Sequence, residues 1–332
     1  MPSRATALAI AGCLVLLAIA CALSLLVGAR SMPPGAAWQA LVAFDADSAD
    51  HAVVLSRLQR TLTGLAVGVA LALAGAALQG MTRNPLADPG ILGLNAGAAA
   101  VVALSVYVLS ISRVAEFMVA GFVGAALAAV VVYAIAAASR SGATPVTLAI
   151  AGAAVTAGLG SVVHGLVLLD QGALDRMRIW QVGTLGARDL GDLAAVAPAL
   201  VLGAAIVLLG ARALNALALG DDAATGLGVH VGRVRVLLGI GIVLLVGAAV
   251  SLAGPIGFLG LVVPHAVRLV VGSDHRRLLP LSAVAGPTVL LLADVVGRVI
   301  APPAEVQVGV MTALLGVPVF LVLIRTRKRV SL

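Results

Sequence analysis

Long runs without a single charged side chain constrain this chain more than any other feature. Nine stretches contain no Asp, Glu, Lys or Arg: 5–29, 61–82, 89–112, 117–139, 141–169, 193–211, 236–267, 278–293 and 306–324. A membrane-spanning helix needs about 17–25 mainly apolar residues. Charged residues make up 11% of the chain, against about 25% in a typical soluble domain. The sequence therefore predicts an all-α polytopic membrane protein with lipid around most of its helices.

The run 236–267 is too long for one span and too short for two. It contains Gly254, Pro255 and Pro264, and proline both removes a backbone donor and clashes with the preceding turn. We predict that these residues break the run into a full helix over about 236–253 and a half-helix over about 257–270. The total becomes about ten transmembrane segments, one of them short.

The basic residues predict the orientation. An even number of segments places both termini on one side, and the tail 325–329 is the densest basic cluster, which is typical of the cytoplasmic side. We expect a multi-pass protein of the cytoplasmic (inner) membrane with both termini in the cytoplasm. The net charge of +7 does not indicate nucleic-acid binding, because the basic residues are dispersed and aromatic residues are few.

Two kinds of chemistry are disfavoured by what the chain lacks. Its only lysine is Lys328, so it has no phosphate-binding P-loop, whose glycine-rich turn is followed by lysine. Any ATP-driven activity would need a separate ATP-binding subunit. Cys13 and Cys21 lie in the first apolar run and behave there as small hydrophobes, and no metal site is predicted.

Several stretches, taken in order, resemble one family: the FecCD-like permease subunits of ABC importers for iron–siderophore complexes, haem and cobalamin. They are 57–62, 72–79, 83–90, 92–97, 254–265, 272–280, 291–294 and 315–320. Within the family, 180–185, 212–215 and 293–300 are most similar to ferric-catecholate siderophore permeases. The resemblance covers nearly the whole chain and implies a single permease domain over 1–332 with a BtuC-like bundle.

The resemblance also implies a function and partners. The chain would carry ferric siderophore complexes, or alternatively haem or cobalamin, across the membrane without catalysing a reaction or binding a cofactor. Two ATP-binding subunits would use ATP and Mg²⁺, a second permease chain (identical or related) would complete the pathway, and an extracytoplasmic substrate-binding protein would deliver the cargo.

Three arginines are candidates for docking that binding protein. Arg57 and Arg60 stand three residues apart at the outer start of a helix, where they share a face, and Arg298 stands at the outer end of another. In similar importers, matching arginines receive carboxylates of the binding protein, a task that suits the planar guanidinium. Two alternatives stay open: anchoring at the membrane interface, and an i,i+4 pair between Arg298 and Asp294.

The stretch at about 215–233 is the candidate contact with the ATPase. It has two short apolar clusters split by glycines, and Asp221 and Asp222 favour the start of a short helix at Ala223. The resemblance implies two short coupling helices here. The residues assigned to coupling are Leu219, Asp221, Asp222, Thr225, Leu227 and Gly228, and the alternative is a solvated connector.

A cytoplasmic gate is predicted at the turn Thr144, Pro145, Val146 and Thr147, because related importers place their gate there. The simpler interpretation is an N-cap for the next helix. Two other function classes are weaker. An ion-coupled secondary transporter would need midplane carboxylates, and Asp294 lies too near the outer end. An intramembrane hydrolase could use Ser161 and His164, but no oxyanion donor is evident, and a neutral, hydrogen-bonded His164 is simpler.

Overall fold

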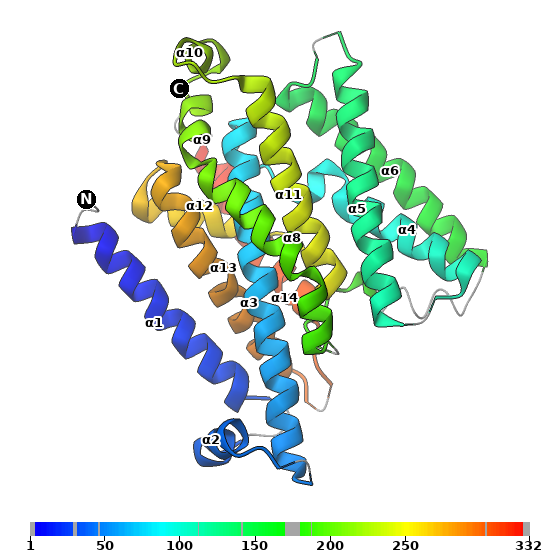
Figure 1. Cartoon of the computed structure of the whole chain (residues 1–332), viewed down its shortest axis with the longest axis vertical. Helices are drawn as coiled ribbons and strands as arrows, with labels where there is room; N and C mark the ends of the chain where they lie inside the picture. The colour runs from blue at the N-terminus through cyan, green and yellow to red at the C-terminus, as the bar shows by residue number, and fades with distance from the viewer. Residues whose placement is uncertain are drawn as a thin grey trace.

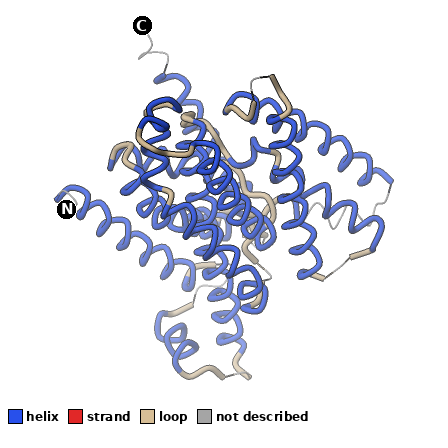
Figure 2. Tube along the Cα trace, turned by 45° about the horizontal axis from the view of Figure 1, so that its top comes forward, coloured by secondary structure: helices blue, strands red, loops and turns tan. Residues whose placement is uncertain are grey.

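The computed structural model describes residues 4–28, 32–45, 47–111, 113–140, 142–169, 180–186, 188–302 and 304–327, and every regular element within them is helical (Figures 1 and 2). Lys328 and Arg329 of the basic tail lie outside the described residues.

Ten apolar helices form the body of the part of the chain that the structure describes. Seven are long and apolar enough to cross a membrane: α1 (Arg4–Leu26), α3 (Ala49–Thr82), α5 (Val114–Ala137), α6 (Pro145–Leu169), α8 (Leu190–Leu209), α11 (Val231–Ala253) and α13 (His275–Val299). Three others have shorter apolar stretches: α4 (Leu94–Leu109), α12 (Leu259–Val271) and α14 (Val308–Arg327). Each corresponds to one of the ten predicted segments, so the predicted all-α polytopic fold is confirmed.

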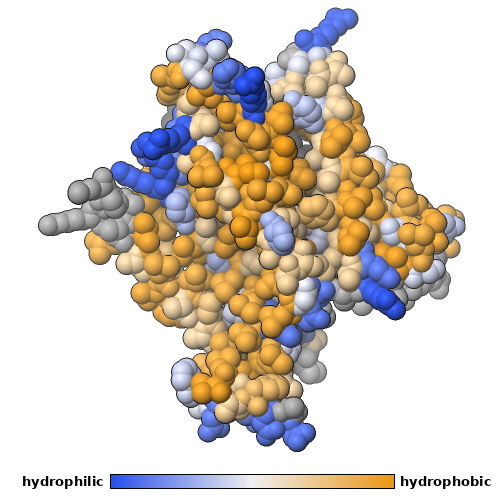
Figure 3. All heavy atoms as spheres, in the orientation of Figure 1, coloured by the Kyte–Doolittle hydropathy of each residue, from blue (hydrophilic) through white to orange (hydrophobic). Residues whose placement is uncertain are grey.

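Short helices mark the two ends of the bundle. Helix α2 (Pro34–Val42) lies at one end, and α9 (Ala211–Ala218) and α10 (Asp221–Gly226) lie at the opposite end (Figure 1). We call these the α2 end and the α10 end. A short 3₁₀ helix, η1 (Pro89–Leu92), precedes α4. On the face drawn in Figure 3, hydrophobic residues cover most of the middle, and hydrophilic residues lie mainly towards the two ends and at the right-hand edge.

Helix α3 is the central element. Its 34 residues correspond to about 51 Å at 1.5 Å per residue, longer than a hydrocarbon core of about 30 Å, so α3 projects beyond the apolar layer. It packs against α13, α11 and α12. A Cβ on Gly68 would clash with the backbone of Pro287, and one on Gly286 with the carbonyl of Gly68. The α3 and α13 backbones therefore touch, as small residues allow between membrane helices.

The predicted helix break is present at Gly254 and Pro255. Helix α11 ends at Ala253, and Gly254 follows with φ 72°, a left-handed conformation that favours glycine. The carbonyls freed by the break have donors: Thr184 N–H donates to Ala253 O at 2.8 Å, and Arg188 Nε donates to Leu252 O. The break is thus covered by protein, which is the condition for irregular backbone at membrane depth.

Pro264, which the sequence analysis also placed at the break, lies inside α12 instead. Because proline has no N–H, the carbonyl of Gly260 loses its i+4 partner. The buried side chain of Gln79 on α3 supplies a replacement, since its Nε2 donates to Gly260 O at 3.2 Å. Gln79 Oε1 in turn accepts from Arg268 Nη2 at 3.0 Å. The helix continues through Pro264 because another helix satisfies the orphaned carbonyl.

Candidate functional site

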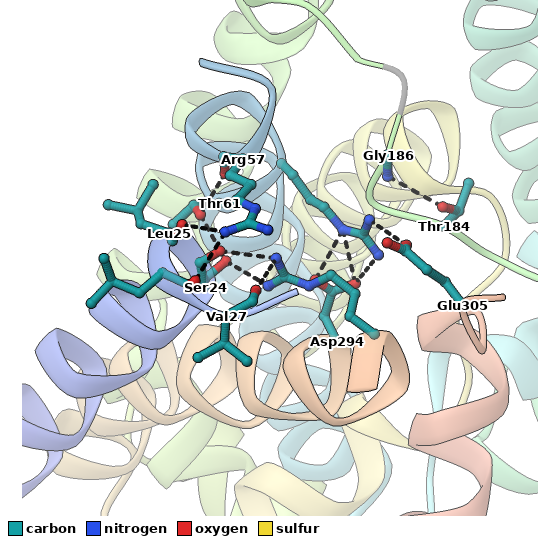
Figure 4. Close-up of polar contacts among 12 residues, drawn as sticks. Ser24, Leu25, Val27, Arg57, Thr61, Thr184, Gly186, Asp294 and Glu305 are labelled. Atoms are coloured by element: carbon teal, nitrogen blue, oxygen red, sulfur yellow. Dashed lines mark hydrogen bonds and ion pairs between the residues drawn. The ribbon is translucent and has the colours of Figure 1, made fainter. Parts of the chain in front are cut away.

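Arg57, Arg60 and Arg298 lie together at the α2 end, and Figure 4 labels Arg57 together with the groups around the cluster, among them Leu25, Asp294 and Glu305. Two of them bind the C-terminal end of α1. Arg57 Nη1 donates to Leu25 O and Leu26 O, both at 3.0 Å, and Arg298 Nη1 donates to Ser24 O and Val27 O, both at 2.9 Å. The last carbonyls of a helix have no partner within it and favour cations, so these arginines cap α1.

The carboxylate of Asp294 holds the cluster together. Arg60 Nη2 donates to Asp294 Oδ1 at 2.8 Å, and Arg298 Nε lies 3.2 Å from Asp294 Oδ2. Asp294 is fully buried. The remaining nitrogen of Arg60, Nη1, lies 2.7 Å from Glu305 Oε2, and Glu305 is the exposed member of the cluster, with 37% of its side chain accessible. The guanidinium groups of Arg60 and Arg298 thus share the buried carboxylate of Asp294, and Arg60 also pairs with Glu305 at the surface.

This geometry decides between two interpretations of Arg298. The i,i+4 pair with Asp294 is confirmed. Docking by the three arginines stays a prediction, and access to them is unequal. Arg298 is 2% exposed and Arg57 is 8% exposed, and both are occupied by α1. Arg60 is 14% exposed and is paired with Glu305, which is accessible at the surface. The alternative of simple interface anchoring does not describe Arg298, whose guanidinium is enclosed by protein.

At the α10 end, helices α9 and α10 join α8 to α11. Leu214 and Leu217 of α9 are buried, whereas Leu219 and Leu227 are each 66% exposed. Helix α9 begins at Ala211, before the predicted segment, and α10 begins at Asp221 rather than at Ala223. The predicted pair of short helices is therefore present. Its exposed leucines lie beyond the ends of α8 and α11, which lead into and out of the segment (Figure 1).

The carboxylate of Asp221 attaches α10 to the bundle. Its Oδ1 lies 2.9 Å from Arg83 Nη2, and its Oδ2 lies 2.9 Å from Arg235 Nη2. Arg83 is the residue that ends α3, and Arg235 lies in the first turns of α11. Thr225 Oγ1 donates to the Asp221 carbonyl at 2.8 Å, which holds the single turn of α10. Asp221 and Thr225 are thus occupied by contacts within the chain, and Gly228 follows the helix with φ 81°.

A further attachment of α9 was not predicted from the sequence. Asn215 of α9 donates from Nδ2 to Asp274 Oδ1 at 2.6 Å, and its Oδ1 accepts from His275 N at 2.9 Å and from His275 Nδ1 at 2.8 Å. Hydrogen bonds from Asn215 and from Arg276 N–H lower the pKa of the Asp274 carboxyl below its ordinary value. The available signal was a lone amide between Leu214 and Leu217 on an otherwise apolar face.

The turn before α6 is a reciprocal cap. Thr144 Oγ1 accepts from Thr147 N at 3.3 Å, and Thr147 Oγ1 accepts from Thr144 N at 2.8 Å. Thr147 Oγ1 also donates to Gly142 O at 2.7 Å. The N-cap interpretation is therefore confirmed, with Pro145 at the first helical position, which proline favours. Val146 is exposed, and the gate role of this turn stays a prediction.

Ser161 and His164 do not form a catalytic pair. Ser161 Oγ donates to Ala157 O at 3.0 Å, and His164 Nδ1 donates to Gly160 O at 2.7 Å. Each side chain is thus bonded to the backbone of its own helix, as predicted for a hydrogen-bonded His164. Among the described residues, no group of three His, Cys, Asp or Glu side chains is placed to hold a metal ion.

The fold and these two polar regions define a class: a multi-span helical membrane protein of the transport-permease type. Residues 16–326 match the model of the FecCD transport family. The chain is 44% identical to the ferric enterobactin transport system permease protein FepD of Escherichia coli, over 97% of this chain and 96% of that protein. It is 46% identical to the cobalamin import system permease protein BtuC of Halobacterium salinarum, over 82% of this chain and 73% of that protein.

A solved structure agrees with the sequence comparison. An inward-facing metal-chelate type ABC transporter superimposes with a TM-score of 0.83 at 29% identity, covering 96% of this chain and 98% of that one. The chain belongs to the FecCD transport family, as its resemblance implied.

Proposed function

We propose that this chain is the permease subunit of an ATP-driven importer that carries ferric siderophore complexes across the cytoplasmic membrane. The observation that carries the proposal is the 44% identity, over nearly the full length of both chains, to a ferric enterobactin permease. The cobalamin relative is of comparable identity, and a hemin permease of Yersinia pestis is 41% identical over 84% of this chain. Haem and cobalamin are therefore the alternative cargoes.

Energy would come from outside this chain. Its only lysine is Lys328, so ATP and Mg²⁺ would be bound by two partner subunits, with no cofactor held here. We place those partners at the α10 end, where Leu219 and Leu227 stand exposed on the coupling segment. This end would face the cytoplasm, which agrees with the basic residues around it: Arg83, Arg212, Arg233, Arg235, Arg276 and Arg277.

The substrate-binding protein would dock at the α2 end. Arg60 is the member of the arginine cluster whose outer partner, Glu305, is exposed. A carboxylate from the binding protein can replace Glu305 on Arg60 while Asp294 keeps its buried pair. Arg57 and Arg298 would then support the site by fixing α1, and they would meet the binding protein themselves only if α1 moved away from them.

A second permease chain would cover α6. One face of this helix exposes Thr156, Ser161 and His164 beside Ala157 and Gly160. Polar side chains in hydrocarbon are costly, and small residues allow close helix contact. A partner chain, identical or related, would pack closely against the small residues. A water-filled pathway between the two chains would solvate the polar side chains. The gate predicted at Thr144–Thr147 would lie at the cytoplasmic start of this same helix.

Reconstitution tests the proposal. The chain would be placed in proteoliposomes with its ATPase subunits, its partner permease where the two differ, and the binding protein. ATP on the ATPase side should drive uptake of a ferric catecholate. Uptake driven by an ion gradient without ATP would instead indicate a secondary carrier, and preferential uptake of haem or cobalamin would select an alternative cargo.

A further inference from the structure

Asn215 uses both halves of its amide, one as a donor and one as an acceptor. Towards Asp274 it must donate, because a carboxylate only accepts; towards His275 N–H it must accept. The distances are 2.6 Å to Asp274 Oδ1 and 2.9 Å from His275 N. Asp274 is the N-cap of α13 and His275 is its first residue. One side chain of α9 thus holds both groups at which α13 begins.

The surroundings make this attachment stiff. His275 is 4% exposed and Leu214, beside Asn215, is fully buried. A Cβ on Gly80 of α3 would clash with the His275 ring and lie 3.0 Å from Leu214. Helices α3, α9 and α13 therefore meet at one packed junction, with no space for one of them to slide alone.

From this junction, α3 and α13 continue together to the other end of the molecule. Their backbones touch at Gly68, Gly286 and Pro287, and at the α2 end Arg60 of α3 is paired with buried Asp294 of α13. Contiguous packed helices and polar networks are the physical means by which distant sites are coupled. The contacts run without interruption from the coupling segment to the arginine cluster.

The other attachment of the coupling segment is of a different kind. The Asp221 pairs with Arg83 and Arg235 involve a side chain that is 41% exposed. Exposed ion pairs are weak and are screened by salt. Asp221 can therefore release α10 while Asn215 still holds α9.

We propose that Asn215 is the positioning residue through which displacement of the coupling segment reaches α13 and α3, and thereby the arginine cluster. The inference rests on the proposed function, because it needs an ATPase that moves α9 and α10. It adds the route by which that movement crosses the membrane.

Exchanging the side chains of residues 215 and 274 tests the contact between α9 and the start of α13. Asn215→Asp places a carboxylate against that of Asp274 and breaks the contact. Asp274→Asn alone keeps it, because the Asn oxygen still accepts from Asn215 and still caps α13. The double exchange N215D/D274N restores the contact with its donor and acceptor reversed, but it gives up the cap, because Asp274 Oδ1 accepts from both Asn215 Nδ2 and Arg276 N–H. The readout is uptake per ATP hydrolysed in the reconstituted complex, beside retention of the ATPase subunits on the purified permease.

We expect Asn215→Asp to keep the ATPase subunits bound while uptake per ATP falls roughly tenfold or more, within the usual range of coupling free energies. Asp274→Asn should stay close to the unmodified protein, and the double exchange should recover most of the uptake per ATP, because the lost cap lowers the stability of α13 without breaking the contact with residue 215. Should Asn215→Asp fail to fold in detergent, Asn215→Ala, which removes the contact without adding charge, should show the same loss.

Unchanged uptake per ATP in a folded Asn215 variant would overturn the inference. So would a loss in Asn215→Asp that the double exchange does not restore, because the defect would then not arise from this contact. Failure of the unmodified permease to retain any ATPase subunit would refute the proposed function itself, and the two failures are therefore distinguishable.

Discussion

The two ends of the α3–α13 pair use charge in opposite ways. At the α2 end, Arg298 and Asp294 are almost fully enclosed, and the guanidinium of Arg57 is bonded to backbone carbonyls of α1. At the α10 end, the Asp221 carboxylate is 41% exposed although it joins two ion pairs, and two leucines stand exposed. A buried network fixes one arrangement of helices, whereas an exposed segment with few attachments is free to meet a partner. The difference indicates a rigid α2 end and an adaptable helix α10 at the opposite end.

The largest expected effect is on the buried carboxylate. Asp294→Ala leaves Arg60 and Arg298 without their shared buried anion, and breaking a buried ion pair typically costs about 3–5 kcal/mol. We expect the folded protein to be lost or its unfolding temperature in detergent to fall sharply. Glu305→Gln, which changes the exposed partner of Arg60, is the matched control and should cost less than about 1 kcal/mol. Equal losses of stability in the two variants would show that the buried Asp294 and the exposed Glu305 do not differ in their contribution.

Next in size is Leu227→Asp at the α10 end. Its side chain is 66% exposed, so the stability of the isolated permease should not change. Binding of the ATPase subunits should weaken by about 2 kcal/mol, the threshold for an interface hot spot. Affinity of the purified subunits measures this, with Leu227→Ile as the apolar control. Full binding by Leu227→Asp would exclude this leucine from the contact.

A smaller effect is expected at the cap of α6. Thr144→Ala removes the hydroxyl that accepts from Thr147 N, and loss of such a cap costs about 1 kcal/mol. Thermal unfolding should detect it, and Thr144→Ser should retain the cap. Since this cap stabilises one helix end only, the change should leave the arginine cluster intact. Destabilisation as large as that of Asp294→Ala would contradict this local role.

The smallest change is expected for Asp221→Asn. Asp221 is 41% accessible, and its partners Arg83 and Arg235 are 37% and 17% accessible; pairs with a solvent-exposed carboxylate contribute about 0–1 kcal/mol. The difference from the unmodified protein should shrink further in about 1 M salt, where the Debye length is about 3 Å. Unfolding measured at low and high salt tests this. A large loss of stability that does not depend on salt would show that Asp221 behaves like Asp294. The distinction between the two ends would then be removed.

Local features were predictable because their causes are local. The helix break at Gly254 and Pro255, the cap at Thr144, and the pair of Arg298 with Asp294 one turn earlier each depend on neighbours in the chain. Pro264 was misplaced for the opposite reason. Its effect depends on Gln79, which is 181 residues from the carbonyl that it satisfies. The Asn215 junction was missed because its partners, Asp274 and His275, come from another helix.

The sequence by itself determined that this chain is an all-helical membrane protein with about ten apolar segments. In lipid, each helix must satisfy its own backbone groups, so the length and composition of a run decide whether it spans. Only the tertiary structure decided which charges are buried and which are exposed. Arg60 and Asp294 are 234 residues apart, and their pairing follows from the depth at which α3 and α13 pack, where Gly68 and Gly286 bring the two backbones into contact.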